Sequence, residues 1–433
     1  MKTILKTQQE EYKQTELGLL PKEWKVVRLG DVAEKMKAGG TPRRGIKKYW
    51  NGKIPFVLIE DMTSCGLYLS KTKETITEEG LKNSSAWLVP KNSLLLSMYA
   101  TIGETAINTI PLATNQAILA IIPKDDFDVV FGAYLLKFSA ERLKMQNIQS
   151  TQKNVNKGVV ENFKIPLPPL QEQKAIAFVL STIQTAKEKT EQVIQATKEL
   201  KKSLMKHLFT YGPVSLKDAE KVKLKETEIG KIPEGWEESE VKKHCKLLTG
   251  GTPNTKIKGY WEPQEIPWMK SGEIQGHKIT SVSTFISKKG LENSNARWLP
   301  KKSVVIALAG RGKTRGTTAP LEFDCTCNQS VVCMKPDEKI DYMYLHYYLA
   351  KLYYYIRRLT GDKDRSGLNK QIVGNIPLFF PNLQTQKKIA SILSAVDEKI
   401  EKEENKKKAL EELFKSMLYN LMSAKIRVKD LGG

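Results

Sequence analysis

Apolar residues recur along the chain in two kinds of pattern, and each kind occurs twice. Short apolar segments bounded by Gly, Pro and Asn predict buried strands; they are 93–97, 117–123, 303–307 and 330–334. Segments 131–146 and 341–359 have the composition of helices. The pattern therefore predicts two mixed regions of about 150 residues each, α/β in composition, and leaves the order of their strands undetermined.

A long polar stretch with helical periodicity follows each mixed region, and its apolar residues occupy two positions of a heptad. In the first stretch these are Ile176, Ile183 and Leu204, and Leu180, Ile194 and Leu208. In the second they are Ile389, Val396, Leu410 and Met417, and Leu393, Ile400, Phe414 and Leu421. Polar residues interrupt both seams midway: Lys187, Thr190, Thr197, Glu403 and Lys407. A seven-residue repeat of this length predicts a coiled-coil seam.

Each long helix has two alternatives for the burial of its apolar stripe. It could pack on its own globular region, or it could pair with the equivalent helix of the other half. Roughly 39 residues form a rod of about 58 Å, which is longer than a region of this size. Pairing between the two helices is therefore the favoured interpretation. Prolines at 168–169 and 381 precede the two helices and suit their entry.

The two halves are copies of one unit. The segment 15–24 returns as 227–236, so that Trp24 corresponds to Trp236, 212 positions later. Further matching pairs are 39–42 (Gly-Gly-Thr-Pro) with 250–253, 49–50 (Tyr-Trp) with 260–261, 115–116 (Asn-Gln) with 328–329, and 171–173 with 384–386. A repeat of this length indicates a duplicated domain rather than a solenoid. Two similar domains suggest a molecule that grips a partner at two places.

Charge and cysteine content narrow the class of partner and the compartment. The formal net charge of +22 favours a polyanionic partner, either nucleic acid or an acidic membrane surface, over a merely basic protein. No apolar run approaches the ~18 residues of a membrane span, and the amino terminus lacks an apolar signal core. Five cysteines, an odd number, fit a reducing compartment. We expect a cytoplasmic protein without membrane contact.

Catalytic and metal-binding motifs are incomplete. Gly310 to Gly316 follows a predicted strand, but a P-loop requires glycine where Ala307 stands, so a basic loop near phosphates is the better interpretation. Cys325, Cys327 and Cys333 have no second Cys or His pair at zinc spacing and are interpreted as buried thiols. Asp61 after Glu60 has no carboxylate counterpart in the second copy, where Lys270 and Ser271 follow Met269. We predict no catalytic residue and no metal site.

The motifs taken together resemble the specificity (S) subunit of type I restriction-modification systems over nearly the whole chain. The openings 15–24 and 227–236 resemble the entry to a target recognition domain. Segment 165–176 (Ile-Pro-Leu-Pro-Pro-Leu-Gln-Glu-Gln-Lys-Ala-Ile) resembles the entry to a spacer helix, and segments 202–205 and 415–418 resemble its exit. The second entry departs from this pattern, because 377–383 has the sequence Pro-Leu-Phe-Phe-Pro-Asn-Leu.

The resemblance implies both a fold and a function. The fold is α+β: two mixed α/β target recognition domains, related by an approximate two-fold axis, separated by two long antiparallel helices that form a coiled coil. The expected divisions are target recognition domains at 1–170 and 227–383, spacer helices at 171–212 and 384–424, a basic connector at 213–226 and a tail at 425–433.

By the same resemblance each domain recognises half of a bipartite, asymmetric site on double-stranded DNA. Two methyltransferase (M) subunits and two restriction (R) subunits complete the complex. S-adenosylmethionine, ATP and Mg²⁺ are expected on those partners, and this chain is expected to bind no cofactor and to catalyse nothing.

Candidate DNA contacts lie in loops where the two copies align but differ in side chain. Lys and Arg supply phosphate contacts, whereas side chains that reach base edges select sequence. The candidates are Arg43, Arg44, Lys47, Lys48, Gln152, Lys153 and Asn154 in the first half, and Asn254, Lys256, Lys258, Lys363 and Arg365 in the second; Arg311, Lys313 and Arg315 add a basic loop found only in the second half. Tyr49, Trp50, Tyr260 and Trp261 are assigned to packing rather than to base stacking.

Two other functions are compatible with part of the pattern. A coiled-coil scaffold with two modules that bind no nucleic acid would explain the repeat and the helices but not the charge. A nuclease or methyltransferase acting alone would require activity from the isolated chain. Salt-dependent DNA binding separates the first alternative from DNA recognition, because counterion release makes affinity fall steeply with salt.

Overall fold

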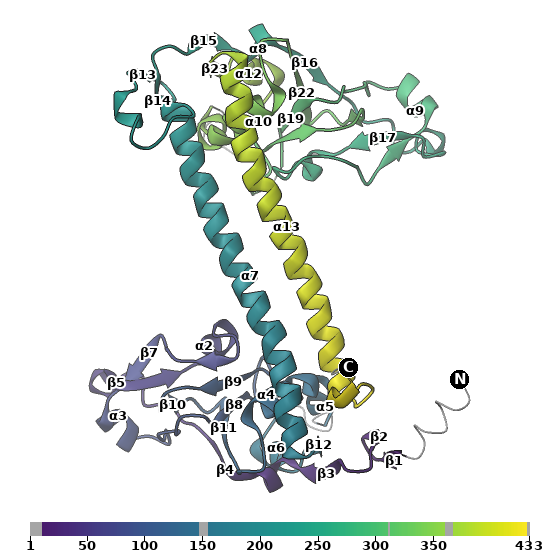
Figure 1. The fold of residues 1–433 in the computed structure, drawn as a ribbon. Helices are drawn as coiled ribbons and strands as arrows, with labels where there is room; N and C mark the ends of the chain where they lie inside the picture. Colours follow the sequence, from purple (N-terminus) through teal and green to yellow (C-terminus); the bar gives the residue numbers. More distant parts are fainter. Residues whose placement is uncertain (1–10, 147–154, 311, 360–366, 431–433) are drawn as a thin grey trace. The chain divides into compact units, whose positions relative to one another are not determined.

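The computed structural model describes residues 11–146, 155–310, 312–359 and 367–430. The chain forms two compact units. Unit 1 comprises 1–191 and 405–433, and unit 2 comprises 192–404, so that each unit includes part of both long helices (Figure 1). The compact units therefore group the chain differently from the sequential domains expected above. That sequential division stays a prediction.

Unit 1 is built on a five-stranded sheet with the order β4-β11-β8-β9-β6 and a three-stranded sheet with the order β10-β5-β7. The strands of these sheets are β4 (Ala33–Ala38), β5 (Trp50–Val57), β6 (Tyr68–Leu69), β7 (Glu74–Ile76), β8 (Leu94–Ser97), β9 (Thr105–Asn108), β10 (Ala113–Thr114) and β11 (Ile118–Pro123). Two antiparallel pairs complete the unit: β1 (Tyr12–Thr15) with β2 (Gly18–Pro21), and β3 (Lys25–Arg28) with β12 (Lys164–Leu167). Its short helices are η1 (Leu29–Val32), η2 (Lys47–Tyr49), α2 (Ile59–Ser64), α3 (Glu78–Lys82), α4 (Val129–Phe138), α5 (Ala140–Met145) and α6 (Lys157–Glu161).

Unit 2 repeats this architecture with a four-stranded sheet, β16-β22-β19-β20, and a three-stranded sheet, β18-β17-β21. These strands are β16 (Cys245–Thr249), β17 (Ile266–Met269), β18 (Phe285–Ile286), β19 (Ser303–Ala307), β20 (Thr318–Leu321), β21 (Thr326–Cys327) and β22 (Val331–Pro336). The antiparallel pairs are β13 (Leu224–Thr227) with β14 (Gly230–Pro233), and β15 (Glu237–Glu240) with β23 (Pro377–Phe380). The short helices are η3 (Ala219–Lys221), α8 (Val241–His244), η4 (Lys258–Tyr260), η5 (Ser271–Glu273), α9 (Lys288–Glu292), α10 (Tyr342–Lys351), α11 (Tyr353–Arg358) and α12 (Lys370–Gly374).

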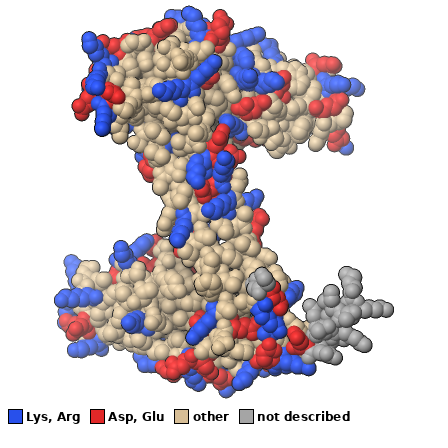
Figure 2. All heavy atoms as spheres, in the orientation of Figure 1, with Lys and Arg blue, Asp and Glu red and all other residues tan. Residues whose placement is uncertain are grey.

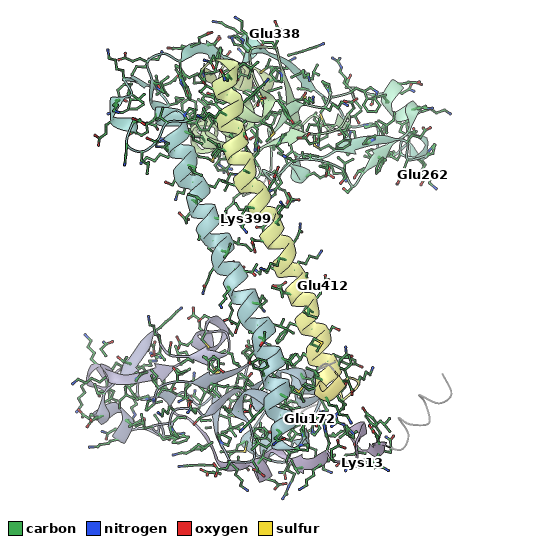
Figure 3. All side chains as sticks on the ribbon, in the orientation of Figure 1. Lys13, Glu172, Glu262, Glu338, Lys399 and Glu412 are labelled. Atoms are coloured by element: carbon green, nitrogen blue, oxygen red, sulfur yellow. The ribbon has the colours of Figure 1, made fainter. Side chains whose placement is uncertain are left out.

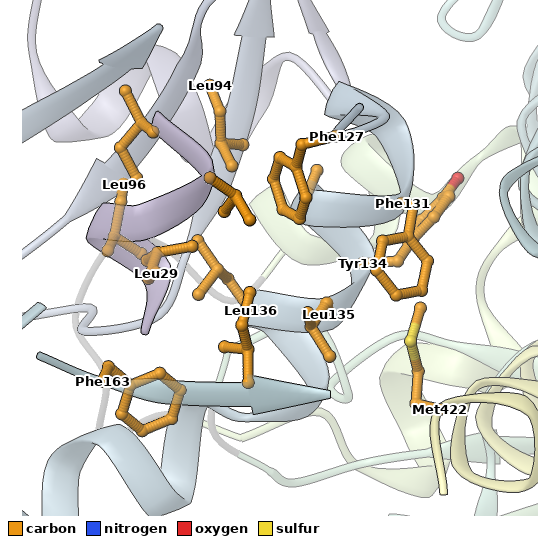
Figure 4. Close-up of a cluster of buried hydrophobic side chains, with 14 of the residues drawn as sticks. Leu29, Leu94, Leu96, Phe127, Phe131, Tyr134, Leu135, Leu136, Phe163 and Met422 are labelled. Carbon is orange, nitrogen blue, oxygen red and sulfur yellow. The ribbon is translucent and has the colours of Figure 1, made fainter. Parts of the chain in front are cut away.

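The central strands are buried on both faces, which explains their continuous apolar sequence. In β8, Leu94 and Leu96 belong to one core cluster, whereas Leu95 belongs to another. Figure 4 shows Leu94 near Phe127, which precedes α4, and Leu96 near Leu29; Phe131 of α4 belongs to the same cluster. In β19 the same alternation separates Val304 and Ile306 from Val305 and Ala307. The predicted strands at these positions are confirmed.

The two helices predicted at 131–146 and 341–359 are each broken, which corrects the expectation of single helices. Ser139 lies between α4 and α5 with φ −87° and ψ 3°, and Leu352 lies between α10 and α11 with φ −82° and ψ 8°. Backbone with ψ near zero leaves α-helical geometry. Periodicity cannot detect this break, because Leu136 and Leu143 are seven residues apart and would share one face of a straight helix.

The long helices are α7 (Leu170–Tyr211, 42 residues) and α13 (Leu383–Met422, 40 residues). In unit 1 the first half of α7 packs on the last half of α13, since Ile176 and Leu180 share a core with Phe414 and Leu421. In unit 2 the last half of α7 packs on the first half of α13 through Leu208, Ile389 and Leu393. The predicted antiparallel packing of these helices is confirmed.

Ion pairs between the two helices follow the same antiparallel order. Unit 1 has Lys407–Glu191 at 2.5 Å, and unit 2 has Lys198–Glu404 at 2.7 Å and Lys201–Asp397 at 2.5 Å. Thr190, one of the predicted polar interruptions, is buried, and its hydroxyl donates to the Ala186 carbonyl at 2.8 Å. Within α13, Lys399 (labelled in Figure 3) pairs with Glu403 at 2.6 Å. The polar residues of the seam thus satisfy one another or the helix backbone.

The tail contains η6 (Val428–Asp430).

Candidate nucleic-acid interface

Three loops of unit 1 lie at one edge of the five-stranded sheet. Ala38, the last residue of β4, pairs with Leu119 of β11, and Ser97, the last residue of β8, pairs with Ile118. The loops that follow β4 and β8 and the loop that precedes β11 therefore emerge at the same edge. We call residues 39–48, 98–104 and 115–117 the loop edge of unit 1.

Unit 2 has an equivalent edge, because Thr249 at the end of β16 pairs with Val332 and Ala307 at the end of β19 pairs with Val331. Its loop edge comprises 250–258, 308–317 without residue 311, and 328–330. In unit 2 this places candidates that are far apart in the sequence, Lys256 and Lys258 in one loop and Lys313 and Arg315 in another, at the same sheet edge; in unit 1 the described candidates all lie in the loop 39–48. Sheet register alone decides this arrangement.

The two motifs shared by the copies hold the loops of each edge together. The Thr41 hydroxyl donates to Oε1 of Gln116 at 2.7 Å, and the Thr252 hydroxyl donates to Oε1 of Gln329 at 2.6 Å. The Met98 amide donates to the Ala117 carbonyl at 2.8 Å, as the Leu308 amide does to Ser330 at 2.9 Å. The Gly-Gly-Thr-Pro and Asn-Gln segments are therefore scaffold, on which the differing side chains are mounted.

Glycine is required at the start of these loops because the backbone approaches a neighbouring strand closely. A Cβ on Gly39 would lie 1.9 Å from the Thr114 carbonyl oxygen, and a Cβ on Gly250 would lie 1.9 Å from the Cys327 carbonyl oxygen. No real Cβ tolerates such a contact.

The first basic loop divides its four candidates into two kinds. Arg44 is held: its guanidinium pairs with Glu74 at 2.8 Å and lies 4.0 Å from the centroid of the Trp50 ring. Lys48 pairs with Glu79, which raises the pKa of Lys48. Arg43 and Lys47 are exposed, and no ion pair to either is present among the described residues. Arg43 and Lys47 are therefore the cations of this loop that are free to meet a phosphate.

The second copy places its candidates on the same loop with different chemistry. The Asn254 side chain accepts the Lys256 amide at 3.0 Å, which closes a turn of the Asx type. Lys258 is 85% exposed and stands 3.5 Å from Glu262. Trp261 donates to the Asn254 carbonyl at 3.3 Å, as Trp50 donates to the Arg43 carbonyl. The equivalent loops thus carry Arg and Lys in unit 1 and Asn and Lys in unit 2.

Three of the four tyrosine and tryptophan residues beside these loops, Tyr49, Trp50 and Trp261, pack within their own unit. Tyr49 is buried, and Trp50 meets Phe56 edge-on at 5.4 Å between ring centroids. Trp261 meets Trp268 in the same way at 5.2 Å. These contacts agree with a packing role.

Two further candidates of unit 2, Lys313 and Arg315, lie on the loop between β19 and β20. Lys313 is exposed and Arg315 is half-buried. Their backbone carbonyls accept hydrogen bonds from Tyr353 and Arg357 of α11. These two residues were missed at the level of sequence, where the run 353–358 (Tyr-Tyr-Tyr-Ile-Arg-Arg) shows only an aromatic and basic cluster.

Six candidates lie outside the described residues: Gln152, Lys153, Asn154, Arg311, Lys363 and Arg365. The described residues that follow two of these segments stand at the loop edges. The Val155 amide donates to the Met98 carbonyl at 3.1 Å. A Cβ on Gly367 would lie 3.5 Å from the Leu308 carbonyl oxygen.

Among the described residues, no group of three or more His, Cys, Asp or Glu side chains is placed to hold a metal ion. Figure 2 shows Lys and Arg spread over the visible face of both units and interleaved with Asp and Glu. The five cysteines are free thiols. Burial raises the pKa of Cys327 to about 12 and that of Cys333 to about 11, so both are protonated at neutral pH. Within the described ranges, no helix combines the length and the apolar character of a membrane span.

Comparison with known proteins identifies the family that has this arrangement of loops and helices. The family model described as "Type I restriction modification DNA specificity domain" matches twice, at 21–199 and 233–412. The chain is 28% identical to the type I restriction enzyme MjaIX specificity subunit of Methanocaldococcus jannaschii, over 97% of this chain and 98% of that protein. It is 27% identical to the MjaVIII specificity subunit of the same organism, over 98% and 97%.

The fold is likewise that of a solved relative. The type I restriction-modification S subunit from M. genitalium superposes with a TM-score of 0.62 at 16% identity, covering 92% of this chain and 96% of that chain. The duplicated match, the two loop edges and the paired long helices together place this chain in the family of type I restriction-modification specificity subunits.

Proposed function

We propose that this chain recognises a bipartite, asymmetric DNA site, with the loop edge of each unit contacting one half-site. The main support for this proposal is that the same backbone scaffold occurs in both units. It presents a different set of side chains at the equivalent sheet edge of each unit. Thr41–Gln116 and Thr252–Gln329 are equivalent, whereas Arg43 in one loop corresponds to Asn254 in the other. Different side chains on equivalent loops would select different bases, which makes the combined site asymmetric.

We further propose that the chain directs two methyltransferase subunits and two restriction subunits to that site and performs no chemistry itself. S-adenosylmethionine, ATP and Mg²⁺ would then bind to those partners. The relatives named above, which are specificity subunits of restriction enzymes, support this assignment. Purified chain incubated with DNA and S-adenosylmethionine should leave the DNA unmethylated. Methylation by the isolated chain would contradict the proposal.

The decisive experiment maps methylated bases across the genome of cells that carry this chain with its methyltransferase. The expected result is one split motif with a gap of constant length and two unlike halves. A continuous motif, or two halves of identical inverted sequence, would refute recognition by two unlike loop edges.

Salt titration of DNA binding by the purified chain tests the scaffold alternative. Neutralising phosphates with Lys and Arg releases counterions, so log Kd should rise steeply with log salt concentration. Each phosphate contact contributes a slope of about 0.9. A flat response would favour a scaffold that binds no nucleic acid.

The long helices are proposed to set the gap between the two half-sites. Both helices are continuous, and at 1.5 Å per residue they are about 60 Å long. Adding four residues to each helix would lengthen it by ~6 Å while nearly preserving the apolar stripe. The gap of the methylated motif should then grow by one or two base pairs. An unchanged gap would disprove this function of the helices.

A further inference from the structure

The basic loop between β19 and β20 is held from one side by two residues of α11. Nη1 of Arg357 donates to the carbonyl of Gly312 at 2.9 Å and to the carbonyl of Arg315 at 3.1 Å. The hydroxyl of Tyr353 donates to the carbonyl of Lys313 at 2.9 Å and accepts from Nη1 of Arg357 at 3.1 Å. Three carbonyls of one short loop therefore point toward α11.

This arrangement decides what the other side of the loop presents. In a trans peptide the carbonyl of one residue and the amide N–H of the next point in opposite directions. The amides of Lys313 and Thr314 consequently point away from α11. Gly312 and Gly316 have φ of +63° and +82°, a conformation that favours glycine. The N–H groups of Lys313 and Thr314 and the exposed Lys313 side chain therefore remain outward, which suits a phosphate or an acceptor on a base edge, whereas the Gly316 amide donates to the Ala307 carbonyl at 2.9 Å.

The support is particular to unit 2. With the repeat offset of 213, Tyr353 corresponds to Ala140 and Arg357 corresponds to Lys144. A Cβ on Gly103 would lie 2.3 Å from the Cβ of Ala140, so the shorter loop of unit 1 packs directly on the helix. Lys144 pairs instead with Glu141 at 2.6 Å. The two copies thus use unlike means to position the same loop.

We propose that Arg357 is a positioning residue for DNA recognition by unit 2, and that it acts through the backbone of the loop 312–316 rather than by contact with DNA. The inference rests on the proposed function. Preorganising this loop before binding removes an entropic cost of association, so loss of the support should weaken discrimination between half-sites. Tyr353 is assigned the same role through Lys313.

Neighbouring residues provide matched controls. Arg358 is exposed and its side chain has no ion pair or hydrogen bond among the described residues, and Tyr354 is 76% exposed. Arg357→Lys and Arg358→Lys both keep the charge. Only the first removes the Nη1 atom that donates to the carbonyls of both Gly312 and Arg315. Tyr353→Phe and Tyr354→Phe both remove a hydroxyl, but only the first removes a bond to the loop.

The experiment first selects duplexes from a random pool with the wild-type full-length chain. Kd is then measured for the selected duplex and for duplexes changed in one half of its motif. Arg357→Lys should reduce discrimination in one half-site roughly tenfold, with the other half and the salt dependence unchanged. Tyr353→Phe should act in the same direction on the same half, and both controls should match the wild type.

Hydrogen exchange adds a measurement that does not depend on the DNA. Backbone amides of 312–317 should exchange faster in Arg357→Lys and Tyr353→Phe than in the control variants, because the loop opens more often. Equal exchange in all variants would overturn the inference. This measurement decides the matter even if one variant binds DNA poorly.

The possible outcomes distinguish this inference from the proposed function. If the wild-type chain selects no split motif, the proposed function fails and the inference fails with it. If a motif is selected but Arg357→Lys and Arg358→Lys behave alike, the inference alone is overturned. Loss of discrimination in both half-sites would also overturn it, since a positioning residue of one loop affects one half.

Discussion

Replacing Gln173 by alanine should destabilise unit 1 by about 4 kcal/mol, because this buried side chain joins α7 to the mixed region. Its Oε1 accepts the amide of Asp128, at the N-cap of α4, at 2.9 Å. Its Nε2 donates to the carbonyls of Asp126 at 3.1 Å and Pro168 at 2.9 Å. Only 1% of the residue is exposed.

The magnitude follows from the burial of the three backbone groups that would lose a partner. The bond to Pro168 is fully buried, and an orphaned buried carbonyl costs about 1–3 kcal/mol. The bonds to Asp126 and Asp128 are partly buried, so water can replace part of each, at about 0.5–1.5 kcal/mol per bond. The lower ends of these ranges total about 2 kcal/mol, and a cavity cost of about 2 kcal/mol brings the expected loss to about 4 kcal/mol.

The second half of the chain has an equivalent glutamine, Gln386, on which the same prediction can be tested. Gln386 is fully buried, its Oε1 accepts the Asp341 amide at 2.9 Å, and its Nε2 donates to Lys339 and Pro381, both at 2.9 Å. Gln386→Ala should therefore destabilise unit 2 by a similar amount. The natural controls are Gln171→Ala and Gln384→Ala, because both side chains are exposed two residues earlier in the same motif.

Calorimetry of the full chain measures both effects. For a unit of this size, 1 kcal/mol shifts Tm by about 2–4 °C, so each buried variant should unfold about 8–16 °C lower. Gln173→Met retains the volume and should recover only the cavity part of the loss. If Gln173→Ala unfolds within 2 °C of Gln171→Ala, the hydrogen bonds do not hold the helix and the reasoning is wrong.

Two further predictions concern the scaffold of each unit. Gly250→Ala should destabilise unit 2 by about 1–3 kcal/mol, measured by urea unfolding, because its Cβ meets the Cys327 carbonyl. The control Gly259→Ala, whose Cβ has nothing within 4 Å, should be neutral. Equal urea midpoints for the two variants would contradict this prediction. Arg427 bonds Glu23 at 2.7 Å and lowers the pKa of that carboxyl below 4.5. Stability from this pair is therefore present above pH 4.5 and is lost as pH falls through the lowered value. The difference in Tm between wild type and Glu23→Gln should shrink on acidification, and a constant difference would refute the linkage.

The heptad and the strand patterns are the parts of the fold that the sequence predicted well. Apolar residues at helical spacing become buried whatever their partner, since burial of an apolar stripe is a local requirement of the helix. Ile176, Leu180, Ile389 and Leu393 are all buried for this reason. Sheet order was not predictable because it depends on segments that are distant in the sequence, and the break at Ser139 was not predictable because the apolar spacing continues across it.

The candidate interface shows the same division. The sequence by itself determined the duplication, the long paired helices and the loops that carry unlike basic residues, because these follow from spacing and composition. Only the tertiary structure decided that Arg44 is held by Glu74 and Trp50 while Arg43 is free, and that Arg357 supports a loop 42 residues before it. Hydrogen bonds and ion pairs need atoms within about 3–4 Å, and it is the folding of the sheets, not the order of residues, that brings such atoms together.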